Sequence, residues 1–289
     1  MFIITGATGQ LGSKIVQNLL PLVPSEQIGI SVRDPAKAAD LEAVGVRVRQ
    51  GDYEDAASLR HAWEGAKRLL IVSSNASASG GDPLAQHATA IAVAQDIGVE
   101  RIFYTSQIAS SLTSLFPPAR THAATEQMLA QSGLAWTAMR HGFYAESALA
   151  MNWRGFASGT LAAPADGKVS WTTHDDLAAA DARLMAGPEV FEGPTPPLTW
   201  PEAIDLAGLA DIAQAVLGKP VTRHLLEDKD MISSAEASGV PSDRIAIMMG
   251  YYRAARAGEF AQVDPTLARL LGRPPQLMAD FMAARLNRN

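Results

Sequence analysis

The chain has 289 residues, of which 47% are hydrophobic and 19% are charged, so it can bury a large core and is not of the disordered class. Its net charge of −6, with no cluster of Lys and Arg, argues against nucleic acid as the main partner. The absence of cysteine excludes disulfides, thiolate metal sites and a cysteine nucleophile. There is no signal-peptide pattern, and no apolar run approaches the ~20 residues of a membrane span, so we expect a cytoplasmic protein without membrane contact.

Short apolar runs alternate with helix-like stretches over the first 140 residues. The expected strands are 2–5, 28–32, 46–49, 69–73, 102–106 and 136–140. The expected helices are 11–20, 35–44, 55–63, 83–97 and 122–132. Most strands are continuously apolar, as in parallel sheets covered on both faces, so the pattern predicts an α/β fold with a Rossmann-type doubly wound parallel sheet over residues 1–140.

The alternation fades after residue 140. Gly155 and Gly159 interrupt the next segment, and helix patterns follow from near His174, over 206–217 and over most of 228–286. We interpret residues 141–289 as a smaller, mainly helical substrate-side subdomain, some segments of which return to the sheet.

The stretch "TGATGQLG" lies between the first strand and the first helix. Glycines there let the backbone approach a pyrophosphate, which then binds N–H groups at the helix N-terminus. The spacing G-x-x-G-x-x-G departs from the common dinucleotide fingerprint, and a tight turn without a ligand is the alternative. The predicted contacts of this turn are Gly6, Ala7, Thr8, Gly9, Gln10, Leu11 and Gly12.

The second expected strand ends in "SVRDPAKA", where a dinucleotide site binds the adenosine ribose. Arg33 suits a 2′-phosphate because a guanidinium can bond two oxygens at once, and Lys37 follows one helical turn later. Asp34 could instead bind the ribose hydroxyls, and Arg33 could be an ordinary solvated residue. This pattern favours NADPH and leaves NADH possible.

Polar side chains follow the third and fourth expected strands, at the sheet edge where ligands bind. Asp52 could accept the adenine amino hydrogen or could cap the next helix, a role for which Asp55 competes. Ser73, Ser74 and Asn75 fit ribose or nicotinamide contacts, although small polar residues suit any loop of this kind.

Taken together, the motifs resemble the NmrA-like branch of the atypical short-chain dehydrogenase/reductases, and within it the bacterial NADPH-dependent quinone oxidoreductases and triphenylmethane-dye reductases. The matching segments are "TGATGQLG", "SVRDPAKA", "GDYED", "LLIVSS", "YTS", "HAATEQMLAQSGLAWTAMRHGFYAE" and "WTTHDDLAAA". The resemblance runs along essentially the whole chain.

The resemblance implies a monomer or homodimer that binds NADP(H) through the glycine turn, Arg33 and Ser73–Asn75. Tyr53 and Thr105, in the "GDYED" and "YTS" segments, join the expected cofactor contacts. It also implies that the "RHGFY" loop closes over the nicotinamide, which adds His141, Gly142, Phe143 and Tyr144. Many relatives carry Asn where this chain has His141, and an imidazole is larger and can change charge near neutral pH.

Short-chain dehydrogenases that reduce carbonyls typically carry a Y-x-x-x-K pair on the helix after the fifth strand. Residues 104–140 contain no lysine, and the corresponding helix reads "HAATE", with His122 and Glu126 one turn apart. Reduction of a carbonyl to an alcohol needs a proton donor of tuned pKa, whereas a quinone or cationic dye accepts hydride more readily. His122, His141 and Tyr144 could donate a proton late in the reaction, and His122 and Glu126 could equally be a helix-stabilising pair.

We therefore expect an NADPH-dependent oxidoreductase that transfers hydride to quinones or similar small conjugated acceptors. A non-catalytic NADP(H)-sensing regulator that binds a protein partner is the alternative, and an NAD-using isomerase or epimerase is disfavoured because such enzymes normally keep the Tyr–Lys pair. The six histidines have no spacing typical of a metal site, so no metal is expected. "GYYRAARAGEF" could form an aromatic lid, with core packing as the default interpretation.

Overall fold

The computed structural model describes residues 1–188, 191–199 and 202–286, and the chain divides into two compact units. Unit 1 comprises Met1–Ser106, Thr121–Arg140 and His174–Pro196, and unit 2 comprises Gln107–Arg120, His141–Thr173 and Pro197–Asn289. The assignment of a cofactor domain to residues 1–140 and a substrate-side subdomain to 141–289 stays a prediction.

Unit 1 contains a seven-stranded sheet in the order β10-β6-β5-β4-β1-β2-β3. Its strands are β1 (Phe2–Thr5), β2 (Ile28–Val32), β3 (Arg47–Gln50), β4 (Arg68–Ile71), β5 (Arg101–Gln107), β6 (Ala135–His141) and β10 (Gly193–Pro194). The registers are parallel, and β1 lies between β2 and β4. The order 3-2-1-4-5-6 has its switch point at β1 and β4, which confirms the predicted Rossmann-type fold.

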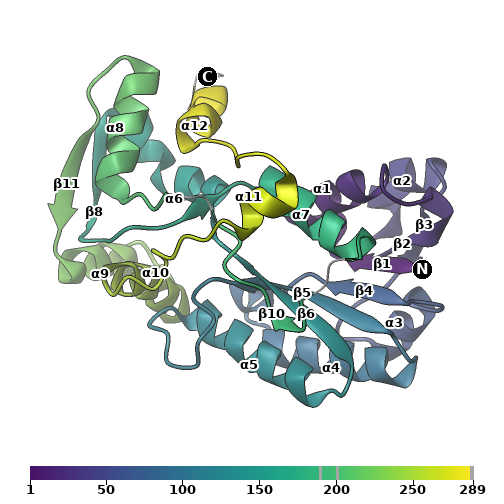
Figure 1. Ribbon diagram of the computed structural model, residues 1–289. Helices are drawn as coiled ribbons and strands as arrows, with labels where there is room; N and C mark the ends of the chain where they lie inside the picture. The colour runs from purple at the N-terminus through teal and green to yellow at the C-terminus, as the bar shows by residue number, and fades with distance from the viewer. Residues whose placement is uncertain (189–190, 200–201, 287–289) are drawn as a thin grey trace. The chain divides into compact units, whose positions relative to one another are not determined.

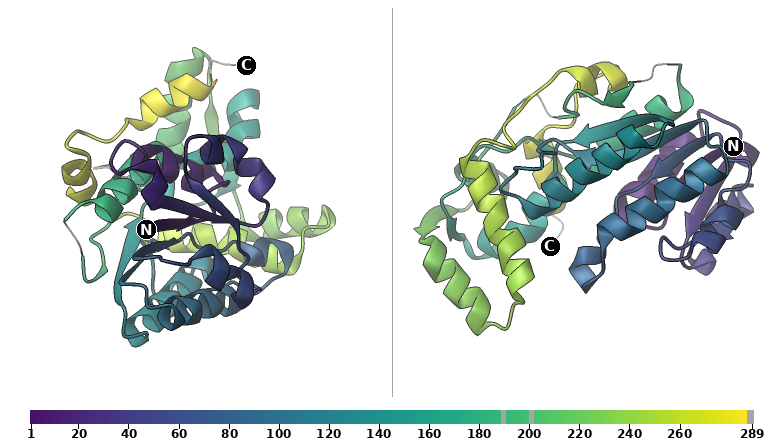
Figure 2. Two further views of the ribbon diagram at one scale, coloured as in Figure 1. Left: turned by 90° about the vertical axis from the view of Figure 1, so that its right-hand side faces the viewer. Right: turned by 90° about the horizontal axis from the view of Figure 1, so that it is seen from below.

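Helices cover both faces of this sheet (Figure 1). One face carries α1 (Gln10–Leu19), α2 (Ala39–Ala43) and α7 (His174–Ala186). The other carries α3 (Ala56–Ala62), α4 (Pro83–Asp96) and α5 (Pro117–Gln131), and α4 and α5 lie in front of the sheet in the right-hand view of Figure 2. Fully buried side chains such as Ile3, Leu69 and Ile102 pack against α3 and α4, so strand alternation places one residue in two on this face.

Two predicted helices begin differently from the expectation. The segment after β2 starts as a 3-10 turn over Pro35–Ala38, which Asp34 caps, and becomes helical only in α2. Helix α5 begins at Pro117, five residues before the predicted start at His122. Proline is tolerated in the first helical turn, where its missing N–H has no partner to lose.

Unit 2 is mainly helical, with short pairs of strands. Its helices are α6 (Ala145–Ser158), α8 (Leu206–Leu217), α9 (Asp228–Ala237), α10 (Ser242–Arg256), α11 (Thr266–Leu271) and α12 (Met278–Leu286). Its strands are β7 (Phe143–Tyr144), β8 (Thr160–Pro164), β9 (Trp171–Thr172) and β11 (Thr222–Leu226). Strands β8 and β11 pair in parallel, as do β7 and β9. The sequence predicted α8 at its observed bounds and missed α6 and all four strands.

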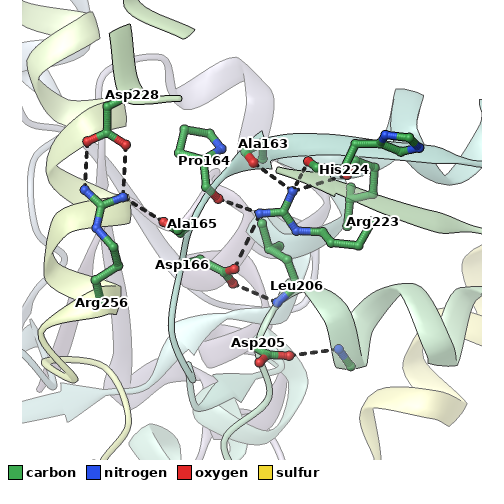
Figure 3. A network of polar contacts seen from close by, with 12 residues as sticks. Ala163, Pro164, Ala165, Asp166, Asp205, Leu206, Arg223, His224, Asp228 and Arg256 are labelled. Atoms are coloured by element: carbon green, nitrogen blue, oxygen red, sulfur yellow. Dashed lines mark hydrogen bonds and ion pairs between the residues drawn. The ribbon is translucent and has the colours of Figure 1, made fainter. Parts of the chain in front are cut away.

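A polar clasp around Arg223 closes the end of the β8–β11 pair in unit 2 (Figure 3). The guanidinium donates to the carbonyl oxygens of Ala163 (2.7 Å) and Pro164 and lies 3.6 Å from the Asp166 carboxylate. Asp166 also accepts the N–H of Leu206, at 2.8 Å, and thereby ties the start of α8 to the end of β8. Burial raises the pKa of the Asp166 carboxyl, and the Leu206 N–H and the Arg223 charge oppose this shift.

Candidate functional site

The predicted glycine turn connects β1 to α1 in unit 1. Gly9 is the N-cap of α1 and makes no side-chain capping hydrogen bond, while its own N–H donates to the carbonyl of Gly6 at 2.9 Å. Ala7 and Leu11 are buried and anchor the turn, whereas Gly6, Thr8, Gly9 and Gln10 are exposed. The exposed face of the turn therefore presents backbone N–H groups at a helix N-terminus, which is the arrangement that binds a pyrophosphate.

Two glycines of the turn cannot take a side chain without strain, Gly6 because of its backbone conformation and Gly12 because of lack of space. Gly6 has a φ of +59°, in the left-handed region, and a Cβ on Gly12 would lie 2.3 Å from the carbonyl oxygen of Gly6. Because the obstacle at Gly12 is backbone, it cannot give way by a change of rotamer. The turn and the first turn of α1 are thus as close as a dinucleotide-binding site requires, and the residues present fit that group.

The charged residues that follow β2 differ in whether they have partners within the protein. Asp34 accepts the N–H of Ala36 at 3.2 Å as a cap, and its other oxygen lies 3.5 Å from Lys37 Nζ. Arg33 is exposed, and the described part of the chain gives its guanidinium no hydrogen bond or ion pair. Asp34, the residue expected for a ribose contact in NAD, is therefore occupied locally, while Arg33 is available for an anion.

In the loop after β3, Asp55 and not Asp52 caps α3. Asp55 accepts the N–H groups of Ala57 and Ser58 at 2.9 and 3.2 Å, so this competitor for the capping role is the cap. Asp52 is half-buried and accepts the N–H of Glu54 at 3.1 Å. Its second carboxylate oxygen has no hydrogen bond within the described residues, so Asp52 keeps an acceptor for the adenine contact that the sequence predicts.

Tyr53 ties the loop after β3 to the ends of β1 and β4. Its hydroxyl contacts the Thr5 hydroxyl and donates to the carbonyl of Val72 at 2.9 Å. Burial raises the pKa of the Tyr53 hydroxyl, which keeps it protonated. The hydroxyl is thus used inside the protein, and a cofactor contact by Tyr53 would involve its half-buried ring.

The polar loop after β4 is held from two sides. Thr105 on β5 is buried, and its hydroxyl accepts the N–H of Ser73 at 2.8 Å and lies 3.2 Å from the Ser73 hydroxyl. The N–H of Ser74 donates to His87 Nε2 at 2.9 Å, and Asn75 is exposed. The structure therefore brings Ser73, Ser74 and Thr105 together beside the switch point.

The helix that lacks the Tyr–Lys pair makes different contacts. His122 Nδ1 lies 2.8 Å from the hydroxyl of Tyr104. Glu126 is buried and accepts hydrogen bonds from Ser106 Oγ (2.6 Å), Arg140 Nε (3.1 Å) and Arg140 Nη2 (2.6 Å). These hydrogen bonds of Glu126 join α5 to β5 and β6.

The expected nicotinamide loop lies in unit 2, at the start of its segment His141–Thr173. The His141 carbonyl accepts the N–H of Ile108 at 2.9 Å, and the Gly142 N–H donates to the carbonyl of Leu198 at 2.8 Å. The His141 side chain is buried, and its ring centroid lies 6.3 Å from that of Tyr144. A Cβ on Gly142 would lie 2.8 Å from a backbone oxygen, so this loop also packs too closely for a side chain.

Phe143 points into an aromatic cluster of unit 2. Its ring centroid lies 5.1 Å from Phe260, 5.3 Å from Tyr251 and 5.5 Å from Trp171. Tyr251 and Phe260 are buried, so the aromatic residues of "GYYRAARAGEF" pack in the core, the default interpretation. A cofactor contact by Phe143 stays a prediction and would involve its backbone.

His87 was not predicted from the sequence as a site residue. This residue is buried on α4 and is joined to both Ser74 and Thr125. The signal in the sequence is a single histidine inside a mainly apolar helix, a position more typical of an ordinary core residue.

Within the described part of the chain, no three His, Asp or Glu side chains gather as a metal site would require. Nor does any described helix combine the length and hydropathy of a membrane span.

Comparisons with known proteins identify relatives along the whole chain. Residues 6–179 match a family described as NAD(P)H-binding. Quinone oxidoreductase 2 of Escherichia coli is 36% identical over 290 residues, which cover 100% of both chains. The crystal structure of the NADPH-dependent quinone oxidoreductase from E. coli complexed with NADPH matches with a TM-score of 0.90 and 36% identity, covering 99% of this chain and 100% of that one. Triphenylmethane reductase from Citrobacter sp., complexed with NADP(H), matches with a TM-score of 0.85 and 30% identity, covering 98% and 100%.

Proposed function

The chain belongs to the NAD(P)H-binding family, and on that premise we propose that it is an NADPH-dependent reductase that transfers hydride to quinones or similar conjugated acceptors. The observation that carries the proposal is the end-to-end similarity to a quinone oxidoreductase whose structure contains NADPH. The glycine turn adds physical support, because its geometry fits a dinucleotide whatever the acceptor.

The predicted family resemblance, oxidoreductase class and NAD(P)H cofactor are confirmed by these relatives. They are named as reductases and oxidoreductases, and no observation favours the alternative of a regulator without turnover. The predicted small-molecule partner follows from the same relatives. The cytoplasmic location and the monomeric or dimeric state stay predictions, the latter testable by light scattering.

Reduction of a quinone agrees with the absence of a Tyr–Lys pair from this chain. NADPH supplies the hydride, so reducing a quinone to a hydroquinone requires one further proton. The helix position at which other short-chain dehydrogenases carry lysine holds Glu126, whose carboxylate is occupied by Ser106 and Arg140. Glu126 therefore fixes the strand ends and does not tune a proton donor. We propose His122, His141 and Tyr144 as the side chains that could supply the late proton.

For the cofactor we propose contacts from three segments of unit 1. The turn Gly6–Gly12 would bind the pyrophosphate, Arg33 the 2′-phosphate with Lys37 nearby, and the strand ends the remaining groups. The strand-end residues are Asp52, Tyr53, Ser73, Ser74, Asn75 and Thr105. His141, Gly142 and Phe143 complete the proposed set from the nicotinamide loop.

The 2′-phosphate assignment is tested with Arg33→Ala. Loss of a charge-assisted contact to the phosphate should weaken NADPH binding roughly ten-fold or more, while the affinity for NADH should change little. Arg60→Ala is the matched control, because it removes the same charge from α3. Equal losses for NADPH and NADH in a fluorescence titration would remove the assignment.

The reductase proposal is tested by mixing the protein with NADPH and a panel of benzoquinones, naphthoquinones and cationic dyes. We expect loss of absorbance at the nicotinamide band with at least one acceptor. Tight NADPH binding without oxidation of NADPH by any acceptor of the panel would contradict the reductase proposal. It would favour the alternative of a regulator without turnover.

A further inference from the structure

Two adjacent residues of α4 hold the polar loop after β4. The N–H of Ser74 donates to Nε2 of His87 at 2.9 Å, and the Ser74 hydroxyl donates to Oε1 of Gln86. Main chain and side chain of one loop residue are thus bound by successive residues of one helix.

The same contacts determine the proton position on His87. Because Nε2 accepts a backbone N–H, the ring proton must reside on Nδ1, which lies 2.8 Å from the Thr125 hydroxyl. The Thr125 hydroxyl in turn donates to the carbonyl of Thr121 at 2.9 Å. The ring is 1% exposed and meets Tyr104 edge to face at 5.3 Å, so neither its tautomer nor its orientation is free.

Gln86 extends this contact to the loop after β3. Its Nε2 donates to Glu54 Oε1 at 2.8 Å, and the N–H of Glu54 donates to Asp52 Oδ1 at 3.1 Å. One continuous chain of hydrogen bonds therefore links Asp52 to Ser74. Both loops carry residues that we assign to the cofactor.

We propose that His87 and Gln86 are positioning residues that set the two cofactor-binding loops of unit 1 at the separation NADPH requires. His87 fixes the main chain at Ser74, and Gln86 spans from Ser74 to Glu54. Neither residue needs to touch the cofactor. The proposal rests on the proposed cofactor site and adds to it two residues of α4 that act through the loops and not on the cofactor.

The surroundings of His87 keep it in the accepting form. Burial lowers the pKa of its imidazole to about 4, and the carboxylate of Asp82 at the start of α4 opposes this shift only partly. From the sheet and the loop after β3, the rings of Tyr104 and Tyr53 face it, and from α5 the neutral hydroxyl of Thr125 does. His122 is one step further away, bonded to the Tyr104 hydroxyl. A protonated Nε2 would face a backbone donor, so only the neutral ring can hold the loop.

A pair of substitutions separates the two hydrogen bonds of His87. In His87→Gln the longer side chain can place an amide oxygen near the position of Nε2 and still accept from Ser74. In His87→Asn the shorter side chain can still donate to Thr125 but cannot reach Ser74. Both variants lose the ring, so both should lose similar thermal stability.

The measurement is the Kd of NADPH for the full chain by fluorescence titration without an acceptor. We expect His87→Asn to raise Kd about ten-fold, and His87→Gln to remain within about three-fold of wild type. The affinity for NADH should fall by the same factor as the affinity for NADPH, because the loop after β4 is remote in sequence from Arg33, the residue proposed to bind the 2′-phosphate. His61→Asn, on the exposed side of α3, is the matched control and should leave Kd unchanged. Equal Kd values for the Asn and Gln variants would overturn the role of His87.

A second test leaves the buried ring of His87 in place and changes Gln86 and Glu54. Gln86→Glu places two carboxylates together and should raise Kd, and adding Glu54→Gln should restore it, since the amide and the carboxylate are then exchanged. Absence of that restoration would overturn the role of Gln86. If wild type itself fails to bind NADPH, the proposed cofactor site fails; if wild type binds and the variants match it, only this inference fails.

Discussion

Acidification should unfold this protein partly through His87. Its imidazole is buried and neutral in the folded state, with a pKa lowered from 6.5 to about 4, mainly by burial. In the unfolded chain the ring recovers its ordinary pKa and binds a proton more readily. The unfolded state thus gains protons as the pH falls below about 6.5, and the folded state does not until about 4, so stability is lost over that interval.

The size of the effect follows from the shift in pKa. A difference of about 2.5 units corresponds to roughly 3 kcal/mol when the interval has been crossed, at about 1.4 kcal/mol per unit. At pH 5, about 1.5 units below the unfolded value, roughly 2 kcal/mol should already be lost. That is a substantial fraction of the 5–15 kcal/mol typical of a folded domain.

The assay is urea unfolding followed by circular dichroism at pH 7.5 and pH 5.0, for wild type and for His87→Gln, which has no group titrating there. Other carboxylates and histidines change both proteins alike and cancel in the comparison. Wild type should lose about 2 kcal/mol more than the variant between the two pH values. An equal loss in both proteins would refute the reasoning that His87 is held neutral.

Three further substitutions test other parts of the structure. Gly12→Ala should weaken NADPH more than ten-fold in a fluorescence titration, because its Cβ would lie 2.3 Å from the Gly6 carbonyl oxygen; unchanged affinity would mean that the turn can open without loss. Arg223→Met should destabilise the protein by about 1–3 kcal/mol, since it leaves the half-buried Asp166 carboxylate without its cation, and calorimetry showing an unaltered Tm would contradict this. The family resemblance implies that Asn makes the nicotinamide contact at this position, so His141→Asn should keep or raise the rate of hydride transfer, whereas a collapse in rate would give His141 an active role.

The sheet was predictable because its signal is local. Apolar runs bounded by turns placed the six main strands within about two residues, and strands β1 and β2 at their observed bounds. Helix α6 was missed because Gly155 reads as a breaker. In the structure Gly155 lies inside the helix, where a Cβ would be 3.1 Å from the Thr160 carbonyl oxygen, so the glycine allows β8 to pack closely. The pairing of β8 with β11 joins segments about sixty residues apart, and no local pattern indicates it.

In the candidate site, too, the residues with a local sequence signal were predictable and those that depend on tertiary contacts were not. The glycine turn and Arg33 were predictable from their places directly after strands. The capping of α3 by Asp55 is one of two alternatives that the sequence left open, whereas the capping by Asp34 was not predicted. His87 could not be found, because its partners Ser74 and Thr125 lie 13 and 38 residues away and meet it only when α4, α5 and the β4 loop are assembled.

Hydride transfer from NADPH to a quinone is the step on which the proposed function depends. The most direct measurement is an anaerobic stopped-flow reaction with NADPH that carries deuterium at the transferable C4 position, and with a benzoquinone in excess. One NADPH should be consumed per hydroquinone formed, with a slower transient for the deuterated cofactor when hydride transfer limits the step. Binding of NADPH without any formation of hydroquinone would contradict it.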